Sequence, residues 1–169
     1  GTHTMKTRFL LFACAALVLS GCSTWLVDPV SPPDGSSLRA TYVGSGNQQF
    51  QCVADKRGYY WRFVAPEVLI RDASGNVFAK QGADFTFRAA DGSYLKATIS
   101  AADTSGSNSR MKNVLFEVTP RGNPAGTLSH FRWVKRTDAT GGIPTIPCRR
   151  NTLGTFLKVP FHATYAFFR

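Results

Sequence analysis

The stretch PFHATYAFF, residues 160–168, alternates between apolar and other side chains along its whole length. One side of an extended chain would carry Phe161, Ala163, Tyr165 and Phe167. A period of two residues is typical of a strand that buries one face and leaves the other in water. This stretch therefore predicts a half-buried antiparallel strand.

The same period recurs in other parts of the chain. In YLKATISA, residues 94–101, the apolar face would carry Leu95, Ala97, Ile99 and Ala101. In TLSHFRWVKR, residues 127–136, we expect Phe131 and Trp133 to face inward and His130, Arg132 and Arg136 to face outward. Segments rich in Gly, Asn and Asp separate these runs and predict turns; Asp91-Gly92 fits a type I′ hairpin turn.

These patterns predict an all-β, mostly antiparallel fold in a single β-sandwich or barrel-like domain over residues 38–169. Residues 111–117, MKNVLFE, are the one place where we expect a short helix as an alternative. Pro66 is expected to interrupt the chain, so that Glu67 begins a new strand after a kink.

The N-terminal residues have the order of an export signal. Met5-Lys6-Thr7-Arg8 is cationic, Phe9 through Leu19 carries no charge, and two small residues follow before Cys22. The apolar run is too short for a bilayer, which needs roughly 20 helical residues. Its end, Leu19-Ser20-Gly21-Cys22, resembles the bacterial lipobox. Residues 1–21 are therefore expected to be an upstream extension plus a lipoprotein signal peptide; an ordinary signal peptide or a buried helix is the alternative.

Cys22 is then expected to be lipidated and to anchor the protein in a membrane. Residues 23–37, STWLVDPVSPPDGSS, contain three prolines and four serines, so residues 22–37 should form the lipidated N-terminus and a poorly packed tether. Ser23, rather than aspartate, follows Cys22, which in enterobacterial lipoproteins implies the outer membrane. The predicted location is the bacterial cell envelope, at the outer membrane and facing the periplasm.

Two of the four cysteines, Cys52 and Cys148, lie in the expected mature domain. Export would place them in an oxidising compartment, where a pair of cysteines is more often a disulfide than a metal site. Because Phe50 and Cys52 share a strand face, the disulfide would lie in the core beside an aromatic ring. Two free buried thiols are the alternative. No metal and no other cofactor is predicted.

The chain has a formal net charge of +10, and removal of Lys6 and Arg8 leaves +8. Such a surface can attract anionic lipid headgroups or acidic envelope polymers. The basic residues form no dense cluster, so a generally basic surface is the alternative, and no nucleic-acid partner is expected.

No catalytic motif supports a particular reaction. The chain contains neither a Gly-x-Ser-x-Gly nucleophile motif nor a phosphate-binding loop. His130 and His162 lie on separate predicted strands and are more simply explained as surface residues. The enzyme alternative is a small envelope hydrolase with a site around His130, Asp138, Thr140 and His162.

Three further residues are candidates for ligand binding together with the two histidines. Glu67 could cap a turn, accept from an arginine or contact a ligand. Gly141 and Gly142 allow backbone angles that other residues resist, either for a tight turn before Cys148 or for close approach of a ligand.

Several spaced motifs together suggest a family. In chain order they are Gln48-x-Phe50-x-Cys52, Trp61-x-Phe63-x-Ala65-Pro66-Glu67, Asp91-Gly92-Ser93, Thr140-Gly141-Gly142-x-Pro144 and Cys148. This order resembles the family catalogued as domain of unknown function 3455, exported proteins of bacteria and fungi. The resemblance covers most of the mature chain and implies a Cys52–Cys148 pairing, but it brings no activity. The expected function is thus a membrane-anchored binding or structural module, with the hydrolase as the alternative.

Overall fold

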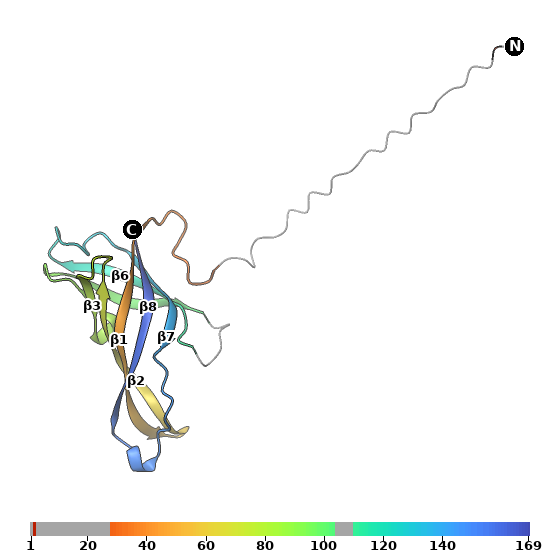
Figure 1. The fold of residues 1–169 in the computed structure, drawn as a ribbon, viewed down its shortest axis with the longest axis vertical. Coiled ribbons are helices and arrows are strands. Elements are labelled where there is room, and N and C mark those ends of the chain that lie inside the picture. Colours follow the sequence, from red (N-terminus) through yellow and green to blue (C-terminus); the bar gives the residue numbers. More distant parts are fainter. Residues whose placement is uncertain (1, 3–27, 104–109) are drawn as a thin grey trace.

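Eight antiparallel strands form one closed barrel in which each strand pairs with its neighbour in the chain and β8 pairs back with β1 (Figure 1). The computed structural model describes residue 2, residues 28–103 and residues 110–169. The strands are β1 (Leu38–Asp55), β2 (Gly58–Arg71), β3 (Val77–Gln81), β4 (Phe87–Arg88), β5 (Ser93–Ala102), β6 (Val114–Gly122), β7 (Trp133–Gly141) and β8 (Phe156–Phe168). Two short 3₁₀ turns, η2 (Ala83–Phe85) and η3 (Arg150–Thr152), complete the elements. The all-β antiparallel prediction is confirmed, and the architecture is a barrel.

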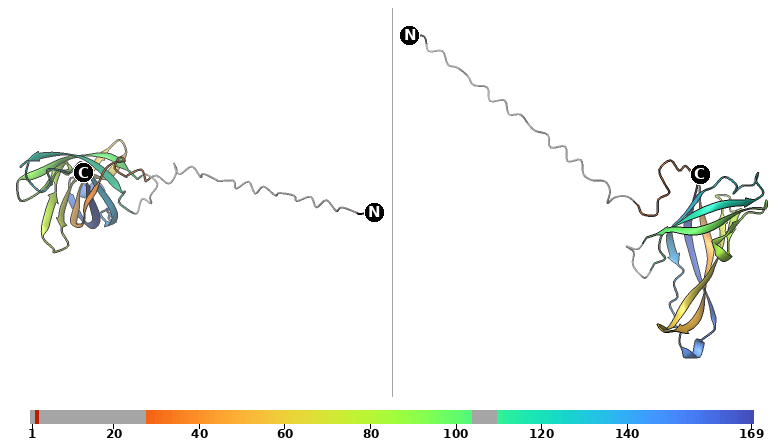
Figure 2. Two further views of the ribbon diagram at one scale, coloured as in Figure 1. Left: turned by 90° about the horizontal axis from the view of Figure 1, so that it is seen from above. Right: turned by 180° about the vertical axis from the view of Figure 1, so that it is seen from behind.

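The barrel interior is filled by the apolar faces of the strands. Strand β8 directs Phe161, Ala163, Tyr165 and Phe167 inward, as its alternation predicts. Gly44 on β1 makes room for Tyr165, because a Cβ at position 44 would lie 2.6 Å from the tyrosine ring. Seen from above, the strands surround a common interior (Figure 2). Closure pairs the outer strands and so removes exposed sheet edges.

One end of the barrel is closed by the segment between β6 and β7. Leu128 is fully buried, and the ring of Phe131 lies 5.2 Å from that of Phe167. Asp91 ties this segment to the β4–β5 hairpin by accepting hydrogen bonds from Thr127. Leu128 and Phe131 thus mark the closed end of the barrel.

Strands β1, β2 and β8 continue beyond the barrel body and form an arm at the other end (Figure 1). The arm comprises residues 50–63 and residues 143–157. Cys52 and Cys148 form the expected disulfide there, with Cα atoms 5.4 Å apart. Cys52 is fully buried, as expected of a core position, but it packs against the loop around Thr152 and Thr155, outside the barrel's main apolar cluster, and Cys148 is only half-buried.

Strand β7 has a different phase from the one expected. It begins at Trp133, and the buried positions are Val134 and Arg136. The outward placement of Arg136 was therefore wrong, because the chain turns between Leu128 and Phe131 instead of continuing as a strand. The phase of β7 therefore places the Arg136 side chain inside the barrel.

Three local predictions also differ from the structure. Residues 111–113 are irregular and lead into β6, so the short helix expected at 111–117 does not form. Pro66 lies within the continuous strand β2, which bulges opposite Gln49 and Phe50 instead of restarting at Glu67. Gly92 alone adopts positive φ in the β4–β5 turn, so this turn is not type I′, which requires positive φ at Asp91 as well.

Residues 28–37 are more closely attached to the barrel than a poorly packed tether would be. Val30 is fully buried, and the Asp28 carboxylate pairs with the Lys135 ammonium. The backbones of Ser37 and Arg169 exchange two hydrogen bonds. The closed barrel, its core and its disulfide are formed by described residues between 28 and 169. In the part of the chain described, no helix is long and apolar enough to cross a membrane.

Candidate functional site

A cavity of about 580 Å³ opens on the side of the barrel that faces the arm. Its walls come from β1, β2, η2, the end of β5, residues 110–112, the start of β6, the middle of β7 and residues 142–143. Most of the lining is apolar: Phe50, Phe63, Phe85, Ile99, Ala102, Met111, Val114, Phe116 and Ile143. Ile99 and Phe63 remain 51% and 38% exposed, so an apolar surface is open to water at the cavity mouth.

Four phenylalanine rings form a continuous wall of this cavity. Phe50 contacts Phe63 edge-on at 5.8 Å, and Phe63 stacks on Phe85 at 5.9 Å with an angle of 8° between the rings. Phe85 in turn lies 5.5 Å from Phe116. Aromatic walls of this kind provide a large apolar contact area with defined geometry.

The backbone at η2 is strained where it delivers the Phe85 ring to the wall. Asp84 and Phe85 both have positive φ, 55° and 58°. A bulky residue in the left-handed region costs about 1 to 3 kcal/mol. The Gln81 side chain helps to hold this turn by donating to the Phe85 carbonyl at 3.2 Å. Such strain is found most often where a side chain is positioned for function.

Arg136 brings a positive charge into the cavity wall. Its side chain is almost fully buried, and Nη2 donates to the Lys112 carbonyl at 2.8 Å. Its Nε has no hydrogen-bond partner, and the ion pairs found between described residues do not include it. Burial lowers the pKa of the Arg136 guanidinium, because desolvation disfavours the charged form.

Two uncharged side chains, Gln48 and Tyr165, also carry an oxygen without a hydrogen-bond partner. Gln48 lines the cavity; its amide nitrogen lies 3.8 Å from the Met111 sulfur, and its Oε1 accepts no hydrogen bond. Tyr165 is the β8 residue that pairs with Arg136, and its hydroxyl is buried without a partner. Burial raises the pKa of Tyr165, despite the opposing effect of the Arg136 charge. Unsatisfied polar atoms are rare in protein interiors and call for an explanation.

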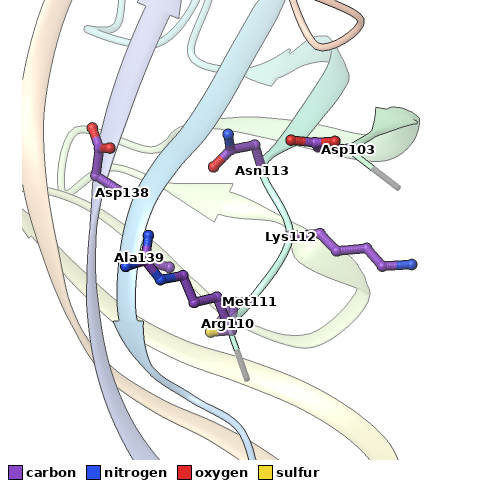
Figure 3. Close-up of a pocket in the computed structure, with 7 residues that line it drawn as sticks. All are labelled: Asp103, Arg110, Met111, Lys112, Asn113, Asp138 and Ala139. Carbon is purple, nitrogen blue, oxygen red and sulfur yellow. The ribbon is translucent and has the colours of Figure 1, made fainter. Parts of the chain in front are cut away.

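A smaller hollow of about 280 Å³ adjoins the cavity mouth (Figure 3). Figure 3 shows Asp103 beside Asn113, while the Lys112 side chain points away from the other residues. Strand β7 bulges here, because its register with β8 shifts between Thr137 and Thr140 and Asp138 takes a φ of 53°. Asp138 is consequently exposed at the rim rather than buried in the cavity.

The residues of the hydrolase alternative are only partly brought together. Thr140 pairs with His162 across β7 and β8, and Asp138 lies at the adjacent bulge. His130, however, lies at the closed end, two residues before Arg132, whose amide donates to the Phe168 carbonyl at 2.8 Å. His162 and Thr140 line a shallow surface hollow with Ser45 and Gly46.

The other candidate ligand-binding residues, Glu67, Gly141 and Gly142, have structural roles. Glu67 faces outward on β2 and pairs with Lys158 at 3.1 Å. Gly141 and Gly142 both have a φ of 82°, where other residues would be strained. A Cβ at position 142 would lie 2.0 Å from the Met111 sulfur, so this glycine lets the chain pack closely and also lines the cavity.

Sequence reasoning missed the residues that make the cavity distinctive. Arg136 was assigned to the wrong face, and Phe85 was not singled out. The inward position of Arg136 could be predicted only if β7 was known to begin at Trp133, because the start of a strand decides which of its residues face inward. Gln48 belongs to the Gln48-x-Phe50-x-Cys52 motif, but the motif predicted no role for its side chain.

Lipidation of Cys22 and the predicted signal segment lie outside the described residues. Within the ranges described, no group of three or more His, Cys, Asp or Glu side chains is placed to hold a metal ion. The chain matches no known family model, no curated protein and no solved structure. The resemblance to domain of unknown function 3455 therefore stays a prediction.

Proposed function

We propose that this protein is an exported, lipid-anchored binding module that holds a small, largely apolar molecule in the cavity of its barrel. The observation that carries the proposal is the cavity itself, whose volume of about 580 Å³ falls among ligand pockets of about 300 to 1,000 Å³. An eight-stranded barrel is also the size at which side chains fill the interior or leave room for one small ligand.

The contrast between the two ends of the barrel supports this function. The closed end is filled by Leu128 and Phe131. The other end keeps Phe63 and Ile99 exposed around an open cavity. Exposed apolar groups around a cavity are typical of a binding site, because a ligand removes them from water.

The anchor and location rest on the sequence. The charged, apolar and small residues that precede Cys22 support export and acylation. Ser23 favours the outer membrane, and we place the domain on its periplasmic face. A lipid anchor would then hold the binding domain at the membrane surface.

The test is binding of a neutral fluorescent probe, N-phenyl-1-naphthylamine, to the purified full chain. We expect saturable binding at one site, with fluorescence that rises as the probe leaves water. Ala102→Phe should weaken binding because Ala102 lines the cavity. Ala101→Phe is the matched control, since the neighbouring side chain does not line the cavity.

A series of alkanols gives a second measure of apolar contact. Each buried methylene contributes about 0.8 kcal/mol, so affinity for competing alcohols should rise roughly fourfold per carbon until the cavity is full. Probe binding that does not saturate, or that is the same in both alanine variants, would contradict the proposed function.

A further inference from the structure

Building on the proposed function, we infer that the molecule in the cavity is an amphiphile whose anionic group, a carboxylate or a phosphate, pairs with the Arg136 guanidinium. In this arrangement the apolar part lies against the phenylalanine wall and the charged group lies against Arg136. The inference rests on the charge, burial and partners of Arg136.

Arg136 has far more hydrogen-bonding capacity than the protein satisfies. A guanidinium carries five N–H donors. One nitrogen reaches the Lys112 carbonyl, and Nε has no partner. A buried charge without a counterion is costly, whereas an arginine with a carboxylate or phosphate forms strong paired hydrogen bonds. An anionic ligand would supply the missing acceptors.

Among the described residues, those that line the cavity with Arg136 include no carboxylate. Strand β1 contributes Gln48 to the wall, and Tyr165 is the uncharged β8 residue that pairs with Arg136. Residues 110–112 add two more basic side chains, Arg110 and Lys112, among those that line the cavity. The carboxylates Asp103 and Asp138 line the adjoining hollow, which shares Arg110 and Lys112 with the cavity. Arg136 lines the cavity and does not line that hollow.

Gln48 adds a second polar side chain to the cavity wall. It lines the cavity with Arg136, and its amide has only the Met111 sulfur as a distant acceptor, so it keeps a donor available for the head group. Tyr165 pairs with Arg136 in the β7–β8 ladder but is not among the cavity-lining residues, and burial raises the pKa of its hydroxyl.

The test compares dodecanoate, dodecyl phosphate and dodecanol as competitors of N-phenyl-1-naphthylamine. Their alkyl chains are matched and their head groups differ. At least one anionic competitor should displace the probe at a concentration about tenfold or more below that of dodecanol, since charge-assisted hydrogen bonds form in a desolvated site. The better of the two anions identifies the head group. Acetate and inorganic phosphate alone should displace little, because they lack the apolar chain.

Arg136→Met should remove this preference: relative to the variant's own affinity for the probe, the anions and dodecanol should displace the probe at similar concentrations. The same variant should raise the melting temperature of the empty protein, because an apolar side chain of similar shape replaces an unpaired buried charge. Arg132→Met is the matched control: it removes one positive charge from an exposed site next to β7 and should leave the preference intact. Arg136→Lys keeps the positive charge but lacks the planar guanidinium, so it should retain part of the preference for anions.

Equal displacement by the anions and by dodecanol would overturn the inference, and so would a preference that survives in Arg136→Met. In either case neutral probe binding would still support the proposed function. Loss of all probe binding by the wild-type domain would overturn both.

Discussion

Asp91 fixes the closed end of the barrel with both of its carboxylate oxygens. One accepts from the backbone and hydroxyl of Ser93 at 3.0 and 2.6 Å. The other accepts from the backbone and hydroxyl of Thr127 at 2.6 and 2.8 Å. The Ser93 hydroxyl also accepts from the Leu128 amide, so the network reaches the buried plug. These hydrogen bonds hold the pKa of Asp91 well below its ordinary value.

This lowered pKa predicts how stability depends on pH. The folded state favours the ionised carboxylate, so the network stabilises the protein above the unfolded pKa, about 3.9, and this stability is lost as the pH falls through the lower folded pKa. Asp91→Asn should lower the melting temperature at pH 7, and the difference from wild type should shrink below about pH 4. Asp34→Asn, at an exposed site before β1, is the control. A difference that stays constant down to pH 2 would contradict this role.

Among the strands, β8 could be predicted and β6 could not, for a physical reason. From Phe161 to Phe167 every second residue of β8 is buried, so its period is visible in the sequence. Strand β6 buries Val114, Leu115 and Phe116 in succession, and a short continuous apolar run does not distinguish strand from helix. The cavity could not be predicted from the sequence, because its walls join Gln48, Phe85 and Arg136, which only barrel closure brings together.

The arm depends on the disulfide more than the barrel body does. Cys52 exchanges backbone hydrogen bonds with residues 154 and 155, and the disulfide joins the same loop to β1 across a sequence separation of 96. Cys52→Ala with Cys148→Ala should lower the free energy of unfolding by about 4 to 5 kcal/mol in the loop-entropy model. Urea unfolding of this double variant and of oxidised and reduced wild type would measure the loss. Equal free energies of unfolding for the double variant and for oxidised and reduced wild type would show that the disulfide contributes little to stability.

At the scale of the whole molecule, residues 28–37 lie beside the C-terminus of the chain, while the arm points away from it (Figure 1). A lipid anchor on Cys22, as proposed, is one way in which the chain would reach a membrane. The chain also has a net charge of +10, so attraction to anionic lipids is a second way to reach a membrane.

Salt separates these two modes of attachment in the full chain. Acyl chains hold a protein by apolar burial, which salt does not screen, whereas electrostatic attraction weakens as the screening length falls from about 10 Å at 0.1 M to about 3 Å at 1 M. Wild-type protein should stay with washed membranes at both concentrations and dissolve only in detergent. Mature-sized protein should be lost in Cys22→Ala, because the modified cysteine is also the processing site; Cys14→Ala is the matched control and should behave as wild type. Release of the wild type by 1 M salt, or normal maturation of Cys22→Ala, would show that attachment is electrostatic or uses another signal.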